Sequence, residues 1–144
     1  MPSSSISSLR TRVSAHLSDA APSEGDVVSV EGWLTFYDEE EKSWKPMKGR
    51  LLVFLDGRKI GETEANDVGM FSFSFVAPSV GRHKVEVRFP SSGKFEGSTK
   101  VVEFRVITAR EKLRVARIAR IAAVLLLLLV FVLILSIFAS KLLR

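Results

Sequence analysis

The chain has 144 residues, of which 47% are hydrophobic, with no cysteine and a formal net charge of +5. The lack of cysteine excludes a disulfide-stapled fold and thiolate metal ligands. The charge is unevenly divided, because residues 1–109 carry 14 basic and 15 acidic residues, whereas residues 110–144 carry 7 basic residues and one acidic residue. The basic character therefore belongs to the C-terminal segment, and we expect no nucleic-acid partner.

The first eight residues are rich in serine and contain no apolar stretch of the length that a secretory signal needs. We expect residues 1–8 to be disordered. From residue 9 to residue 107, apolar and polar side chains alternate with a period of two, and turn residues interrupt the alternation at regular spacing. This pattern predicts a sandwich of about seven antiparallel strands, since each apolar sheet face must be covered by another.

The alternation is clearest where a valine-rich segment begins at Val28. Val30 and Leu34 fall on one face of this expected strand, and Trp33 and Tyr37 fall on the other. The dipeptide Asp-Gly at 56–57, which follows an apolar run, indicates a hairpin turn. The remaining strands that the alternation indicates are 13–17, 51–55, 71–75, 84–89 and 102–106.

The C-terminal region has a different pattern. Residues 121–140 contain no charge, are apolar on all sides, and would span roughly 30 Å as an α-helix, which predicts a transmembrane helix. Residues 108–120 contain no proline or glycine, so we expect a juxtamembrane helix continuous with the span and a short tail at 141–144. The basic residues expected to contact lipid headgroups are Arg110, Lys112, Arg114, Arg117 and Arg120.

Several segments carry glycine, proline or aspartate between the expected strands. They include GDVVSVEG at 25–32, KPMKG at 45–49, NDVGMFS at 66–72 and PSVGRHKV at 78–85. With these motifs, the stretch 25–107 resembles the bacterial and archaeal Ig-like domains found in cell-surface proteins. The resemblance implies an Ig-like β-sandwich over residues 9–107 that serves as a spacer, an adhesion unit or an interaction module.

The charge bias and the family resemblance predict opposite sides of the membrane for the sandwich. Five basic residues precede the predicted span and two follow it, and this bias places the sandwich in the cytoplasm. The resemblance implies the opposite side of the cell membrane, because domains of this kind are usually outside the cell. Both placements stay open, and both describe a single-pass membrane protein.

The sequence offers little material for enzyme chemistry. His16 and His83 are expected on polar strand faces without a carboxylate at ligand spacing, so we interpret them as surface residues. No nucleophile-elbow, phosphate-loop or dinucleotide motif occurs. We therefore expect no catalytic residue, cofactor, metal or small-molecule substrate. The acidic run from Asp38 to Glu41 is interpreted as a solvated loop, with calcium binding as the alternative.

Three aromatic residues remain as candidates for a binding surface. Trp33 and Tyr37 share the strand face opposite the apolar one, and Trp44 follows in the next loop. Exposed aromatic side chains commonly anchor a partner, whereas the alternative is that one tryptophan closes the core. The sequence thus favours a membrane-anchored interaction or accessory module that binds another membrane or surface protein. An outward-facing adhesion or glycan-binding module is the second reading.

Overall fold

The computed structural model describes residues 7–143. The chain forms two compact units, which meet between Ile107 and Thr108. Most of the segment expected to be disordered, residues 1–6, lies outside the described residues. Within the described part, the Ser8 hydroxyl donates a hydrogen bond to the Glu96 carboxylate at 2.6 Å.

The described residues contain the strands β1 (Thr11–Leu17), β2 (Val27–Asp38), β3 (Ser43–Pro46), β4 (Gly49–Leu55), β5 (Arg58–Ala65), β6 (Met70–Val76), β7 (Gly81–Phe89) and β8 (Ser98–Val106) and the helix α1 (Ala109–Leu142). The strands pair antiparallel in two four-stranded sheets. The predicted class, an antiparallel β-sandwich followed by one apolar C-terminal helix, is confirmed.

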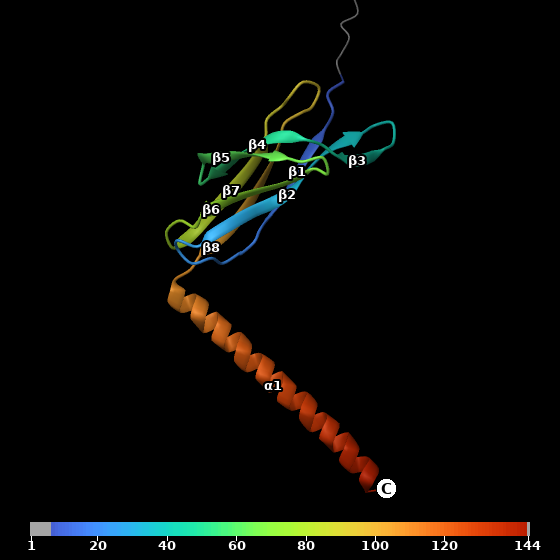
Figure 1. The fold of residues 1–144 in the computed structure, drawn as a ribbon, viewed down its shortest axis with the longest axis vertical. Helices are drawn as coiled ribbons and strands as arrows, with labels where there is room; N and C mark the ends of the chain where they lie inside the picture. The colour runs from blue at the N-terminus through green and yellow to red at the C-terminus, as the bar shows by residue number, and fades with distance from the viewer. Residues whose placement is uncertain (1–6, 144) are drawn as a thin grey trace, which may run out of the picture. The chain divides into compact units, whose positions relative to one another are not determined.

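The long strand β2 organises the first sheet (Figure 1). β1 pairs along one edge of β2, from Val30 to Phe36. β6 and β3 share the other edge in succession, because β6 pairs with residues 27–33 of β2 and β3 with residues 35–38. The second sheet has the order β5-β4-β7-β8.

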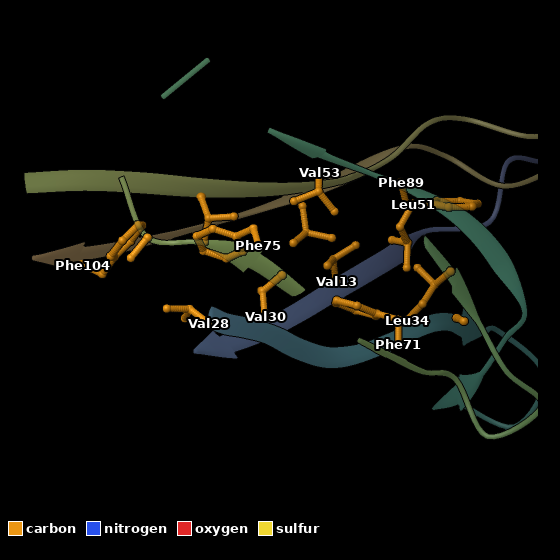
Figure 2. Close-up of a cluster of buried hydrophobic side chains, with 14 of the residues drawn as sticks. Val13, Val28, Val30, Leu34, Leu51, Val53, Phe71, Phe75, Phe89 and Phe104 are labelled. Carbon is orange, nitrogen blue, oxygen red and sulfur yellow. The ribbon is translucent and has the colours of Figure 1, made fainter. Parts of the chain in front are cut away.

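The core lies between the two sheets (Figure 2). Along β2 the inward residues Val28, Val30 and Leu34 are fully buried, and Leu51 and Val53 of β4 lie opposite them in the second sheet. The alternation read from the sequence therefore identifies the buried face of β2. The aromatic members of the core are Phe71, Phe75, Phe89 and Phe104.

The edges of the two sheets are not left open along their length. β1 lies beside β8, and parallel bridges join Leu9 to Phe95 and Ser23 to Ile107. On the other side, the Thr63 hydroxyl of β5 donates to the Ser72 carbonyl of β6 at 2.8 Å. Among the described residues, the outer edge of β3 pairs with no strand. Of the sheet edges, β3 is thus the one most open to another chain.

α1 is one continuous helix of 34 residues, which corresponds to about 51 Å. Thr108 and Glu111 start it with a capping box, in which the Thr108 hydroxyl accepts from the Glu111 N–H at 3.2 Å. Its most apolar window has a mean hydropathy of 3.4, and none of its described side chains is buried. α1 therefore has the length and composition of a membrane-spanning helix, and it lacks the burial that marks a core helix.

Candidate partner-binding surface

The outward face of the first sheet carries the three aromatic residues. Trp33, Thr35 and Tyr37 follow one another on this face of β2, since every second residue of a strand points the same way. Trp44 of β3 is the direct cross-strand neighbour of Tyr37. Trp33 is 44% exposed and Trp44 is 36% exposed, so neither tryptophan closes the core.

Tyr37 and Trp44 form a compact cluster with two arginines of the N-terminal strand region. The Tyr37 and Trp44 rings meet edge to face, with their centroids 5.3 Å apart. The Arg10 guanidinium lies 4.6 Å from the centre of the Tyr37 ring, and the Arg12 guanidinium lies 4.4 Å from that of Trp44. Cation–π contacts of this kind hold long side chains in place, so this part of the surface is ordered before any partner arrives.

Trp33 has a different environment in the middle of the sheet. The His16 ring stacks on its indole with centroids 6.3 Å apart. Met70 of β6 is its cross-strand neighbour and is exposed. Trp33 and Tyr37 are four residues apart, which corresponds to about 13 Å along β2. The surface therefore has two aromatic centres on one face, and we refer to Trp33, Tyr37 and Trp44 together as the aromatic surface.

The acidic run from Asp38 to Glu41 forms the hairpin between β2 and β3, next to the aromatic surface. Lys45 ion-pairs with Asp38 at 2.7 Å and with Glu41 at 2.9 Å. The hydrogen bond from Lys45 lowers the pKa of Asp38, and the same bond raises the pKa of Lys45. Over residues 7–143, no group of three or more acidic or histidine side chains is placed to hold a metal ion. Lys45 of β3 thus stabilises the hairpin through these two ion pairs.

The reading of His83 as a surface residue without a carboxylate neighbour was wrong. Its side chain is only 13% exposed, and Nδ1 lies 2.5 Å from Asp56 Oδ2. Nε2 lies 2.6 Å from the carbonyl oxygen of Ser79. The Asp56 carboxylate and the Ser79 carbonyl are both acceptors, so this geometry favours the protonated form of the His83 ring, in which both nitrogens donate. His83 is an even number of residues from the buried Val85 and Val87, so it lies on the same, inward face of β7. The sequence could have revealed the burial of His83 through this spacing.

His16 also has a carboxylate nearby, because its Nε2 lies 3.9 Å from Glu31 Oε2. Both groups are about half exposed, so this pair contributes little to stability. The absence of a neighbouring carboxylate was therefore a wrong expectation for both histidines. The surface position expected for His16 agrees with its exposure.

The His83–Asp56 pair predicts a pH dependence of stability. The hydrogen bond to Asp56 raises the pKa of His83 above its ordinary value of 6.5. Stabilisation from this histidine is therefore complete below about pH 6.5 and is lost as the pH rises through its folded-state pKa. We expect the melting temperature of the full chain in detergent to fall between about pH 5.5 and about pH 8.5 by more in the wild type than in His83→Gln.

His16→Gln is the matched control for this experiment, since it removes the exposed histidine and leaves the His83–Asp56 pair intact. It should keep the wild-type pH dependence. A His83→Gln variant with an unchanged pH dependence would show that the imidazolium does not stabilise the sandwich.

The basic residues predicted to contact lipid headgroups all lie in the first turns of α1, before the uncharged segment begins at Ile121. The four arginines among them are exposed, and Lys112 is partly exposed. These residues, which we call the basic belt, are Arg110, Lys112, Arg114, Arg117 and Arg120.

Fold and surface together define a class of protein, a β-sandwich joined to one helix that suits a membrane. The chain is 48% identical over 145 aligned residues to a protein of Archaeoglobus fulgidus that is described only as uncharacterized, and the alignment covers 100% of both chains. No family model matches the sequence. The chain therefore belongs to the same family as this archaeal protein, and the alignment extends over both the sandwich and the helix of this chain.

Proposed function

We propose that the protein is a non-enzymatic, tail-anchored, single-pass membrane protein whose Ig-like sandwich is an interaction or accessory module. Its partner is another membrane or cell-surface protein, and the aromatic surface carries the contact. The observation that carries this proposal is the ordered cluster of Tyr37 and Trp44 with Arg10 and Arg12 on an exposed sheet face.

The strand order supports an Ig-like assignment. In constant-type Ig sandwiches the first, second, fourth and fifth strands share one sheet, and the third, sixth and seventh share the other. Here β1, β2 and β6 share one sheet and β4, β7 and β8 share the other, whereas β5, the fourth strand of the pattern, departs from it by pairing with β4. β3 is then an addition between the second and third strands of the Ig pattern, and it is the strand that carries Trp44.

The composition of the surface supports a protein partner. Tryptophan, tyrosine and arginine are the residues most enriched among those that dominate binding energy at protein interfaces. Rings already held by cation–π contacts lose little side-chain entropy on binding. The open edge of β3 beside Trp44 offers main-chain hydrogen-bond groups to the same partner.

The position of the cluster within the sandwich is also suitable. β1 and β8 run parallel, and β2 runs against β1, so the C-terminal end of β2 lies at the end where β8 starts. Tyr37 and Trp44 thus lie at the end of the sandwich opposite Val106, from which the chain continues to α1. With 12 residues, β2 spans about 40 Å, so the cluster lies about a full strand length from the end of the sandwich that contains Val106.

Removal of the aromatic cluster tests the proposal. We expect Tyr37→Ala/Trp44→Ala to lose the partner that copurifies with the wild type from a mild detergent extract. Truncation of one interface hot spot costs about 2 kcal/mol or more, so the affinity for the identified partner should fall by at least about 30-fold. Val27→Ala/Val76→Ala is the matched control, because it trims two exposed side chains at the other end of the same sheet face.

Two results would count against the proposal. The first is a wild-type protein that is alone and monomeric in the extract. The second is a double aromatic variant that retains its partner with unchanged affinity while the control variant behaves in the same way.

The side of the membrane is tested separately with protease added to intact cells. The excess of basic residues before the span supports a cytoplasmic sandwich, which the protease would leave intact. The Ig-like resemblance supports an external sandwich, which the protease would remove.

An outward-facing adhesion or glycan-binding module is the second candidate function. A hollow of about 380 Å³ beside Trp33 favours it, because Glu31, Glu64 and Asn66 line the same hollow. An indole flanked by carboxylate and amide groups provides a stacking face and hydrogen-bond groups, as sugar rings require. Protease accessibility from outside, together with loss of glycan binding in Trp33→Ala, would select this candidate.

A further inference from the structure

A hollow of about 560 Å³ lies over the start of β7 and the end of β8, away from the aromatic surface. Its lining is dominated by charged residues from these two strands and from the turn after β4. The lining residues that matter for its charge are Arg82, His83, Lys84, Arg105, Asp56 and Glu103.

Arg82 and Arg105 are direct cross-strand partners in the β7–β8 ladder, so their exposed side chains leave the same face of the sheet. Like charges in directly opposite positions destabilise a strand pair. Over residues 7–143, no carboxylate forms an ion pair with Arg82, Arg105 or the neighbouring Lys84. An anion between these side chains would relieve the repulsion.

Three other cations on the same sheet are ion-paired. Arg50 and Lys59 both pair with Glu62, and Arg88 pairs with Glu86 at 2.6 Å. Arg82 and Arg105 differ from these three because they lie directly opposite each other and neither has an ion pair among the described residues.

The Asp56 carboxylate interacts electrostatically with Lys84, and among the described residues it forms no ion pair with either arginine. Asp56 is already engaged, because it accepts from His83 Nδ1 at 2.5 Å and from the Lys84 backbone N–H at 3.0 Å. Glu103 is the cross-strand partner of Lys84 and is one negative charge against the two arginines and Lys84. The hollow thus has a net positive lining.

This end of the sandwich is close to α1 in sequence. Arg105 precedes the first residue of α1, Ala109, by four positions, and the basic belt follows in α1. Both groups of cations therefore precede the uncharged segment that begins at Ile121.

We propose that Arg82, Lys84 and Arg105 form a binding surface for a phosphate group, and that headgroups of the membrane holding α1 supply it. Arginine side chains bind phosphate oxygens through paired N–H donors, and Lys84 adds a point charge. This inference rests on membrane attachment through α1, and it is independent of the partner proposed for the aromatic surface.

The test is an NMR titration of the full chain in nanodiscs. The side-chain Nε–H signals of Arg82 and Arg105 are assigned as those that disappear in Arg82→Gln and in Arg105→Gln. One series adds phosphatidylglycerol to phosphatidylcholine discs, and a second series adds inorganic phosphate to discs of phosphatidylcholine alone. We expect both signals to shift with phosphatidylglycerol. Loss of one cation should weaken the response of the remaining arginine by about 5-fold.

Lys42→Gln/Lys100→Gln is the matched control. It removes two positive charges near the opposite end of the sandwich and should leave the response intact. A response to inorganic phosphate without one to phosphatidylglycerol would overturn the lipid as the source. No response in either series would overturn the site, whereas failure of the chain to enter discs would refute membrane attachment instead.

Discussion

Gly32→Ala is expected to unfold the sandwich or to destabilise it by about 3 kcal/mol or more. A Cβ atom at this position would lie 1.8 Å from the backbone oxygen of Ser14 and 2.9 Å from the Cα of Ala15. These are main-chain atoms of β1, so no side-chain rotation relieves the overlap. β1 would have to leave β2, with which it pairs from Thr11 to Leu17.

The measurement is urea unfolding of the full chain in detergent, followed by the circular dichroism of its strands. Gly57→Ala serves as the control, since its added Cβ has no heavy atom within 4 Å and only its φ of +83° opposes the change. That variant should lose about 1 kcal/mol. Equal stability of the two variants would show that β1 does not approach β2 as closely as described.

Arginine in the middle of α1 is expected to abolish membrane insertion. The segment 121–140 contains fifteen Leu, Ile, Val and Phe residues, which together favour insertion by roughly 5–9 kcal/mol. Each arginine near the helix centre costs roughly 3 kcal/mol. Leu127→Arg/Val130→Arg/Leu133→Arg therefore offsets the whole apolar contribution.

Insertion is measured by flotation of the chain with liposomes after synthesis in their presence. Alanine at the same three positions removes only roughly 1–2 kcal/mol, so this control should still float. A triple-arginine variant that floats like the wild type would mean that something other than α1 holds the protein on the membrane.

The strands that the sequence predicted are those with one clearly apolar face. β1, β2, β6, β7 and β8 alternate apolar with polar residues, because one side of each packs in the core, and β4 is a short run of apolar residues. The helix was equally clear, since its apolar residues extend around the whole circumference.

β3 and β5 were not predicted individually. β3 has four residues and contains Pro46, and it forms because β2 extends beyond β6 and leaves an edge for it to pair with. β5 has charged residues at half of its eight positions and is an edge strand, where charges are common. Both strands depend on their neighbours in the sheet, so local alternation does not reveal them.

The candidate surfaces likewise combine features that the sequence predicted with features that it did not. The outward direction of Trp33 and Tyr37 follows from strand parity and was predicted, as was the helical segment that carries the basic belt. The contacts of Arg10 and Arg12 with the rings depend on the register between β1, β2 and β3, and the opposition of Arg82 and Arg105 depends on the β7–β8 register. Register is a property of paired strands, which a single segment of sequence does not specify.

Alkaline extraction of membranes that contain the unmodified chain is the most direct test of a β-sandwich anchored by a membrane-spanning helix. The protein should stay in the pellet at high pH and enter the supernatant only when detergent is added. A chain released by alkali alone, and dispersed as a monomer without detergent, would contradict membrane anchoring and the function built on it.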